Sequence, residues 1–443
     1  MENATGLSLG RGSWRTWLIV VLVASACLRV GVVATTRPLT APDTRGYLRL
    51  AGRIARLDLS GDTGERTPVY PVFILLLGRN AQAIRAAQML LGLLVTAAVF
   101  WMVWTLSRNA LAAAAASALY GLNLMQVFYE AHVLTETLAT FLVTMAAALM
   151  VWLWMDRTRC LKRRLALLGA CCGLLALTRP VYVLVPLVFA VPLLVWLPGR
   201  RRALVLFLLP ALLPYLGWCA FNQVRFDTFA PTALAGLGLT NKTGAYMQDA
   251  PSRFATVRDI YVAARAAHHG RTIDLIWRID GALMRRTGQT LPRLSRTFMS
   301  IDIYLITHHP VRYAGNVAHA IADFWKGWGY HPWLADPLGL TRVAWLVVRS
   351  LAVLVSGVFL LLVGLAAARV LRLRTWALES AVPWLAVAVL STCLACALVE
   401  YGANGRFGLP TEPLVFVVAA TLLAGIAEDR GSRANSQGPR SQP

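Results

Sequence analysis

Long apolar segments alternate with short polar ones along this chain, and most of the apolar segments hold roughly 20 residues. A helix of that length crosses ~30 Å of hydrocarbon, so the pattern predicts membrane-spanning helices. The segments lie at 17–35, 82–106, 110–128, 132–155, 165–178, 181–197, 203–221, 343–368, 376–398 and 410–427. The piece at 69–77 is too short to cross and should dip into the membrane or lie at its surface. We therefore predict an all-α polytopic membrane protein with a bundle of about 10 (9–12) transmembrane helices.

Composition supports this class, because 57% of the 443 residues are hydrophobic and the mean hydropathy is +0.58. A soluble fold could not bury so large an apolar fraction. The first segment lacks a small-residue cleavage site, so we expect a retained helix and not a removed signal. The seven Cys all lie in or beside predicted spans, which argues against a disulfide framework. Cys393 and Cys396 have CxxC spacing inside an apolar run, so packing explains them better than metal or redox chemistry.

The formal net charge of +22 comes almost entirely from Arg and sets the expected orientation. Basic residues gather in the connections on one side of the predicted bundle: Arg11, Arg15, Arg108, Arg157, Arg159, Lys162, Arg163, Arg164, Arg200, Arg201, Arg202, Arg369, Arg372 and Arg374. The positive-inside rule makes that side cytoplasmic. Anionic membrane lipids are the expected partners of these loops, and nothing in the charge pattern calls for nucleic acid.

These boundaries predict five parts. Residues 1–16 form a cytoplasmic N-terminus, and 17–221 form a transmembrane core whose first outer loop, 36–81, carries the catalytic groups. Residues 222–342 form a larger outward-facing loop or cap before the last three helices, at 343–427. Residues 428–443 have no apolar pattern and should be a disordered cytoplasmic tail. We expect a multi-pass protein of the inner (plasma) membrane with its site facing the periplasm or the outside.

The first outer loop contains the pattern of an amphipathic helix. Arg recurs at positions 45, 49, 53 and 56, and an apolar face collects Tyr47, Leu50, Ala51, Ile54 and Leu57. Such a helix would lie on the outer membrane surface with its Arg toward the head groups. Simple anchoring explains these Arg, and so does contact with a phosphate-bearing lipid substrate.

Asp43 precedes that helix directly, and Glu65 and Arg66 close the loop before Pro68. A carboxylate at a helix start can cap backbone N–H groups, so Asp43 is either an N-cap, a functional acid or both. Glu65 and Arg66 could form an exposed ion pair in a surface turn. In the functional interpretation, a rigid Pro turn holds a carboxylate beside a guanidinium, whose planar fork suits phosphate oxygens.

Further charges fall at the same outer surface. Glu130, His132 and Glu136 lie at the outward start of a span, with His132 and Glu136 one helical turn apart. Acidic groups inside spans usually face a polar cavity, although a helix-start carboxylate also satisfies the dipole. Other charged groups at outward turns or near the outer face are Arg179, Glu400, Arg406 and Arg29, the last close enough to snorkel outward.

Six of the seven His, namely His268, His269, His308, His309, His319 and His331, fall in the 222–342 loop without a familiar ligand spacing. Solvated loop residues explain them better than a metal site, so no cofactor is expected, although a divalent ion stays open. No Gly-rich phosphate loop or nucleotide fingerprint is present. Trp and Tyr at 324–333 should anchor the loop at the membrane interface.

Four local patterns resemble the C-type glycosyltransferases (GT-C), in the branch with protein O-mannosyltransferases and the lipid A aminoarabinose transferase. They are PDTRGYLRLAGRI at the start of the first outer loop, ERTPVYPVF at its end, HHPVRYAGN at 308–316, and NGRFGLPTEPL before the last span. Their order, their spacing and the large first loop are similar to the family over about residues 15–427. The resemblance predicts a GT-C-like bundle.

The resemblance implies a hexosyl- or pentosyl-transferase that takes its sugar from a polyprenyl-phosphate donor by a single inverting displacement. It implies that Asp43 is the first-loop acid that deprotonates or orients the acceptor hydroxyl. It likewise makes Glu65 the second acid, and Arg66 the cation near the lipid phosphate. The wider substrate-binding set is Arg66, Tyr70, Glu130, His132, Glu136, Arg179 and Arg406.

The chain departs from the family pattern in three places. Thr44 follows Asp43 where members often carry a second acid, Arg66 stands where Lys is usual, and Phe407 where Tyr is common. The extra soluble domain of the protein mannosyltransferases has no counterpart, so the expected acceptor is an envelope lipid or glycan. Two other interpretations stay open: a lipid-linked sugar flippase or transporter, although no inverted repeat is visible, and a non-catalytic subunit that binds polyprenyl lipid.

Overall fold

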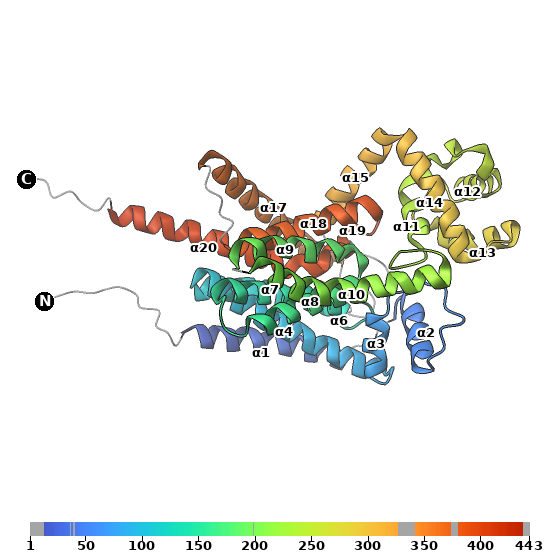
Figure 1. Cartoon of the computed structure of the whole chain (residues 1–443). Coiled ribbons are helices and arrows are strands. Elements are labelled where there is room, and N and C mark those ends of the chain that lie inside the picture. Colours follow the sequence, from blue (N-terminus) through green and yellow to red (C-terminus); the bar gives the residue numbers. More distant parts are fainter. Residues whose placement is uncertain are drawn as a thin grey trace, which may run out of the picture.

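The computed structural model describes residues 13–35, 37–38, 40–197, 199–326, 342–373 and 380–436. Every regular element among them is a helix, and the helices form two parts: a bundle of long helices, and a group of shorter ones at one end of it (Figure 1). The all-α prediction is therefore confirmed for the described residues. We call the group of short helices, residues 235–325, the cap.

The bundle carries the apolar segments of the sequence. Its helices are α1 (Ser13–Thr35), α4 (Ala81–Ser107), α5 (Ala110–Gly121), α6 (Leu124–Glu130), α7 (Glu136–Met155), α8 (Leu161–Thr178), η1 (Pro180–Leu184), α9 (Val185–Trp196), α10 (Arg200–Phe226), α17 (Arg342–Leu373), α18 (Val382–Val399), α19 (Asn404–Gly408), η5 (Leu409–Thr411) and α20 (Glu412–Ser436). A large hydrophobic core built from most of these helices runs through the bundle. Within the described residues, each of the ten predicted spans overlaps at least one helix.

Not all of these helices qualify as membrane spans. Among the described residues, seven are long and apolar enough to cross a membrane, or up to eight if α5 and α6, which meet at a 50° bend, count as one. The α8 helix opens with the basic run Lys162–Arg164, and η1 and α9 together cover only Pro180–Trp196. The protein is a multi-pass membrane protein, but the predicted count of about ten spans is not confirmed.

Close packing of α8 against α10 depends on two glycines. A methyl group added at Gly169 would overlap the backbone oxygen of Phe207, and one at Gly173 would overlap the backbone oxygen of Pro210. Small residues at such crossings let two helix backbones approach, which is how helices associate where no water drives them together. The α10 helix continues to Phe226, past the predicted end of its span at 221, and leads into the cap (Figure 1).

The first loop forms α2 (Thr44–Ala55) and α3 (Val69–Leu76). The α2 helix is amphipathic as predicted, and it buries Tyr47, Leu50 and Ala51. Leu57 does not belong to this face: the helix has already ended, its φ is 54°, and the side chain is 92% exposed. The short α3 confirms that the apolar piece after residue 68 is not a span of its own.

The cap has its own core, separate from that of the bundle. Its helices are α11 (Ala235–Thr243), η2 (Gly244–Asp249), η3 (Ser252–Phe254), α12 (Ala255–Ala267), α13 (Leu275–Thr287), α14 (Leu291–His308) and α15 (Pro310–Trp325). Apolar positions on α11 to α14, among them Leu237, Tyr261, Ile276 and Phe298, fill the interior. The α15 helix starts at Pro310, a residue suited to the first helical turn, where its missing N–H is not needed.

The two ends of the bundle differ in what they carry. The start of α1 and the end of α20 lie at one end, whereas α2 and the cap lie at the other (Figure 1). Two predictions about the termini change. The α20 helix runs to Ser436, so the expected disorder from 428 is wrong as far as that residue, because a helix already anchored by buried turns extends at little cost. The described residues do not include 1–12 or 437–443. They also leave out residues 327–333, which belong to the Trp-rich segment.

Asp302 on α14 is the one acid wholly enclosed in the described part of the cap. Its carboxylate is 0% exposed and accepts hydrogen bonds from Thr243 at 2.5 Å and Thr240 at 3.0 Å. Burial raises the pKa of Asp302 to about 8, although both hydroxyl donors oppose that shift. At neutral pH the folded cap therefore holds this group largely protonated.

The stability of the cap should fall as the pH rises from about 4 toward 8. Over this window the unfolded chain has released the Asp302 proton while the folded cap keeps it, which removes about 1.4 kcal/mol per pH unit. Hydrogen exchange of the α11 and α14 amides, corrected for intrinsic rates, measures this slope. Asp302→Asn should flatten it, and Asp259→Asn, at a largely exposed acid of the same cap, should not. Equal slopes in wild type and Asp302→Asn contradict the assignment.

Candidate functional site

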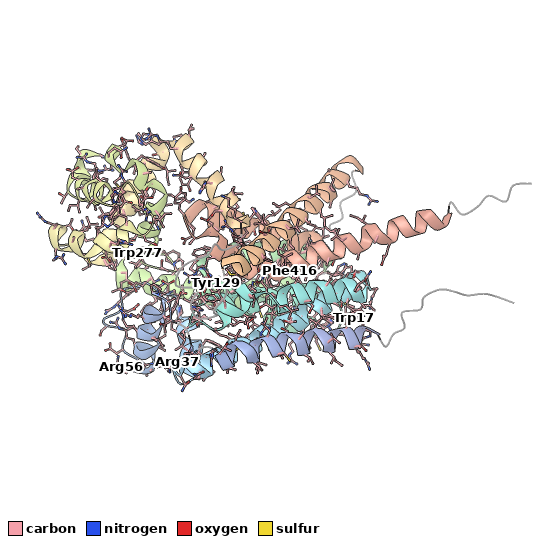
Figure 2. All side chains as sticks on the ribbon, turned by 180° about the vertical axis from the view of Figure 1, so that it is seen from behind. Trp17, Arg37, Arg56, Tyr129, Trp277 and Phe416 are labelled. Carbon is pink, nitrogen blue, oxygen red and sulfur yellow. The ribbon has the colours of Figure 1, made fainter. Side chains whose placement is uncertain are left out.

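Five charged side chains from separate parts of the sequence meet where the bundle faces the cap. Asp43 precedes α2, Arg66 precedes α3, Glu136 opens α7, Arg179 separates α8 from η1, and Arg406 lies in α19. All five therefore stand at helix ends or in the turns between helices. Tyr129 interacts electrostatically with four of them, and Figure 2 shows it where the bundle meets the cap.

The carboxylate of Asp43 holds two arginines. Its Oδ1 accepts a hydrogen bond from Nη2 of Arg66 at 2.9 Å, and its Oδ2 accepts one from Nη1 of Arg406 at 3.1 Å. Asp43 occupies the N-cap position of α2 without making a side-chain capping bond. The side chain therefore does not cap the helix start, because it turns to the two arginines, and its predicted role as a functional acid stays a prediction.

Glu136 also contacts two arginines, and it is more deeply buried than Asp43. It is 0% exposed, accepts a hydrogen bond from Nε of Arg406, and lies 3.3 Å from Nη1 of Arg179. The five groups thus form an alternating chain in the order Arg66, Asp43, Arg406, Glu136 and Arg179. With three cations and two anions, the chain carries one positive charge more than it neutralises, which favours an anionic ligand.

Two of these arginines contact aromatic rings, and partial burial affects the ionisation of Asp43. The guanidinium of Arg66 lies 4.8 Å from the ring centre of Tyr47, and that of Arg179 lies 4.2 Å from the ring centre of Phe407. Burial alone would raise the pKa of Asp43, but the guanidiniums of Arg66 and Arg406 together hold it below its usual value. Asp43 therefore stays ionised at neutral pH.

Several buried polar atoms of this site make no hydrogen bond within the described part of the protein. They are Nε of Arg66, the hydroxyl of Tyr129, Oε2 of Glu136 and Nη1 of Arg179, whose contact with Glu136 lacks hydrogen-bond geometry. Buried polar groups are nearly always satisfied, and each exception needs a reason. A ligand with oxygen acceptors and a hydroxyl donor would satisfy this set, so the arrangement suits a phosphate joined to a sugar.

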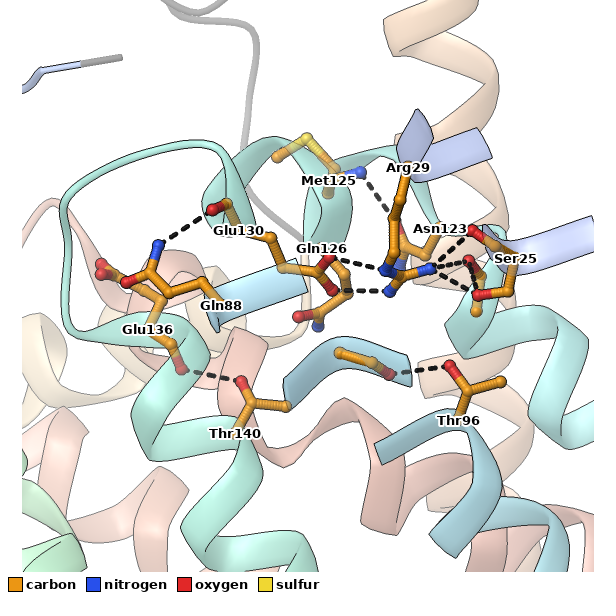
Figure 3. A network of polar contacts seen from close by, with 12 residues as sticks. Ser25, Arg29, Gln88, Thr96, Asn123, Met125, Gln126, Glu130, Glu136 and Thr140 are labelled. Carbon is orange, nitrogen blue, oxygen red and sulfur yellow. Dashed lines mark hydrogen bonds and ion pairs between the residues drawn. The ribbon is translucent and has the colours of Figure 1, made fainter. Parts of the chain in front are cut away.

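Glu130 lies apart from this chain, in a pair with Arg29. Nε and Nη2 of Arg29 donate to the two oxygens of Glu130 at 2.7 and 2.6 Å, and Nη1 donates to the carbonyl of Gly121 at 2.9 Å (Figure 3). Arg29 is only 2% exposed, so it does not snorkel outward as predicted: a buried acid satisfies it inside the bundle. The pairing favours a structural role for Glu130, and its contact with substrate stays a prediction.

Tyr70 and His132 support the turn that carries Glu136. Tyr70 donates to Oε1 of Gln88 at 2.8 Å, and Nε2 of Gln88 donates to the carbonyls of Glu130 and His132 at 2.9 and 2.6 Å. His132 is 2% exposed, and burial lowers its pKa to about 4, so it is neutral at physiological pH. Neither residue is a member of the charge chain, and their predicted contacts with substrate stay predictions.

Glu65 is half-buried beside Arg66 but forms no ion pair with it in the described structure, because the Arg66 guanidinium turns to Asp43. Its predicted catalytic role stays a prediction. Sequence reasoning did not assign Tyr47, Tyr129 and Phe407 to the site. The available signal was adjacency, since Tyr129 and Phe407 directly neighbour Glu130 and Arg406 in the sequence.

No group of three or more His, Cys, Asp or Glu that could hold a metal ion occurs among the described residues. The described site thus offers arginines, and not a preformed metal cage, as its cationic groups.

Comparison with known proteins adds little. No family model and no curated protein sequence matches the chain. One solved structure, ArnT from Cupriavidus metallidurans bound to undecaprenyl phosphate, aligns at 16% identity and a TM-score of 0.37, covering 97% of this chain and 82% of that one. That TM-score is too low to establish a shared fold, so functional arguments rest on the site of this chain alone.

The pair of Arg29 and Glu130 provides a test of structural against substrate-binding roles. Glu130→Gln should lower the free energy of unfolding by about 3–5 kcal/mol, because it leaves a buried guanidinium unpaired. The double variant Arg29→Met, Glu130→Leu should recover most of that loss. Thermal unfolding of the purified protein in detergent measures both, with the exposed Glu428→Gln as control. Unchanged unfolding with weakened substrate binding would instead support the sequence-based prediction for Glu130.

Proposed function

We propose that this protein is an integral-membrane glycosyltransferase that moves a sugar from a polyprenyl-phosphate donor to a hydroxyl of an envelope lipid or glycan. The observation that carries the proposal is the convergence of Arg66, Arg406 and Arg179 around two carboxylates, with buried donors left unsatisfied. Transfer from a lipid phosphate needs cations where the phosphate leaves. Because the site stands at the end of an apolar bundle, a lipid donor can keep its chain in the bilayer while its phosphate reaches the arginines.

The direction of the site follows from the distribution of charge. The opposite end of the bundle carries Arg157, Arg159, Lys162 and Arg163 in the connection before and at the start of α8, and Arg200 to Arg202 open α10. By the positive-inside rule that end faces the cytoplasm, so the charge chain and the cap face the periplasm or the outside. Transfer on that face would use a donor already carried across the inner membrane.

In the proposed reaction the acceptor oxygen attacks the anomeric carbon in one displacement, and the bond to the phosphate oxygen breaks with inversion. Arg66 is the best placed of the arginines to bind the phosphate, because it is the most exposed and one of its nitrogens is still unbonded. Arg406 touches both carboxylates and holds the chain together.

Asp43 takes part through the arginines it holds. The resemblance predicts that it deprotonates or orients the acceptor hydroxyl. Both its oxygens are bonded to guanidiniums, however, and its pKa is held below the usual value. This geometry favours a role in fixing Arg66 and Arg406 for phosphate binding. An acid whose pKa is lowered is also a weaker base.

Arg66→Gln should weaken binding of polyprenyl phosphate by about 10- to 100-fold, since a charge-assisted hydrogen bond contributes about 1.5–3 kcal/mol. Equilibrium binding to the protein in lipid nanodiscs measures this loss. Arg53→Gln is the matched control, because Arg53 lies in the same loop and pairs loosely with Asp62 at 3.7 Å. An equal loss in both variants would mean that loop charge in general, and not this site, attracts the lipid.

Asp43→Asn should reduce transfer of radiolabelled sugar by about 100-fold or more and weaken donor binding as well, because Arg66 and Arg406 lose their shared anchor. EDTA should leave the wild-type rate unchanged. Retained donor binding with abolished transfer would instead make Asp43 the base that the resemblance predicts. Tight donor binding with no transfer by the wild type, from any lipid-linked sugar tested, would favour a flippase or a non-catalytic subunit.

A further inference from the structure

The turn between α18 and α19, residues 400–403, lies in the seam between bundle and cap, and its acid is not part of the charge chain described above. Gly402 in this turn has a φ of +88°, and a side chain there would overlap Ile273 of the cap. The ring of His319 on α15 lies 5.9 Å from that of Tyr401. Two cap residues, Ile273 and His319, therefore lie beside this turn.

Glu400 begins this turn and differs from the other acids of the site. It is half-buried, and its carboxylate takes part in none of the ion pairs or hydrogen bonds found among the described residues. Asp43 and Glu136, in contrast, are each held by two arginines. Glu400 still feels the site electrostatically, through Arg179, Arg406 and Asp43.

Lys242 on α11 approaches the same turn from the cap. It is 1% exposed, its Nζ makes no hydrogen bond within the described structure, and it lies 5.3 Å from the ring centre of Tyr401. An ammonium buried without a partner is costly, so it is kept where a neighbouring charge or ligand uses it. Lys242 interacts electrostatically with Glu400 and Cys396 without contacting either as an ion pair.

We propose that Glu400 is the proton acceptor of the transfer reaction and that Lys242 helps it to ionise. This inference rests on the proposed glycosyltransferase function and assigns the group that takes the proton from the acceptor hydroxyl. As the acceptor oxygen bonds to the anomeric carbon, its proton passes to the Glu400 carboxylate. The bond between the anomeric carbon and the phosphate oxygen breaks, and its electron pair leaves with the polyprenyl phosphate.

The electrostatic setting of Glu400 suits this role. Burial raises its pKa to about 7, while Arg179, Lys242 and Arg406 act in the opposite direction and Asp43 adds to the rise. A base works best when its pKa lies near the operating pH, which holds for Glu400 and not for Asp43. Lys242 comes from the cap, so its position beside the turn contributes to how readily Glu400 ionises, together with Arg179 and Arg406 of the bundle.

The test compares donor binding and sugar transfer in the full-length protein in lipid, with a radiolabelled polyprenyl-phosphate sugar and extracted envelope lipids. Glu400→Gln should lower the transfer rate by about 100- to 10,000-fold while the Kd for polyprenyl phosphate stays within about threefold. Glu400→Asp should recover part of the rate. A Glu400→Gln protein that transfers within about threefold of wild type overturns the inference and leaves the proposed function standing. A wild type that transfers from no donor overturns both.

Lys242→Met gives a readout that a merely structural role would not move. In the wild type the transfer rate should rise with pH as Glu400 loses its proton around pH 7. Without the nearby ammonium the carboxylate ionises less readily, so the rising limb should shift to higher pH by about half a unit or more. Lys162→Met, at an exposed lysine at the opposite end of the bundle, should leave the limb in place. Should Glu400→Gln fail to fold, an unmoved limb in Lys242→Met overturns the proposal by itself.

Discussion

The alternation of charge in the site is the constraint on which the structure most depends. A guanidinium taken from water into a helical bundle is costly unless acceptors satisfy it, and a carboxylate also offsets its charge. Here each carboxylate touches two arginines, so Asp43 ties the first loop to α19, and Glu136 ties α7 to α19 and to the α8 turn. Loss of Asp43 would leave Arg66 without its ion pair, and loss of Glu136 would do the same to Arg179. The same contacts that bring segments far apart in sequence together therefore also create the cationic site.

A second consequence is that the cap and the bundle are not independent. Each has its own core, yet Ala233 at the root of the cap donates its backbone N–H to Gly64 of the first loop at 2.9 Å, and Tyr313 of α15 bonds the carbonyl of Leu398 at 2.6 Å. The position of the cap over the bundle is therefore fixed by hydrogen bonds to the first loop and to the end of α18.

The sequence predicts the helices well and the pairing of charges poorly. Apolar length alone locates the long helices of the bundle, because a helix in lipid must satisfy its own backbone. It does not locate the long cap helices α14 and α15. Periodicity locates the buried face of α2, but it cannot tell that the helix stops before Leu57, which depends on a single residue with positive φ. Glu130 lies 101 residues from Arg29, and Arg406 lies 363 residues from Asp43, so local spacing carries no trace of these pairs. The predicted count of spans is not confirmed, since α8 begins with basic residues and α9 is short.

Environment, and not residue type, separates the roles of the acids around this site. Asp43 and Glu136 have arginines on both sides, which favours their charged form and makes them poor proton acceptors but good anchors. Glu400 has cations near it without contact, so its carboxylate remains available to a substrate hydroxyl. Acids whose environments push their pKa values apart take different parts in one reaction. In the proposed mechanism, the arginines that would bind phosphate also determine which carboxylate is left to accept the proton.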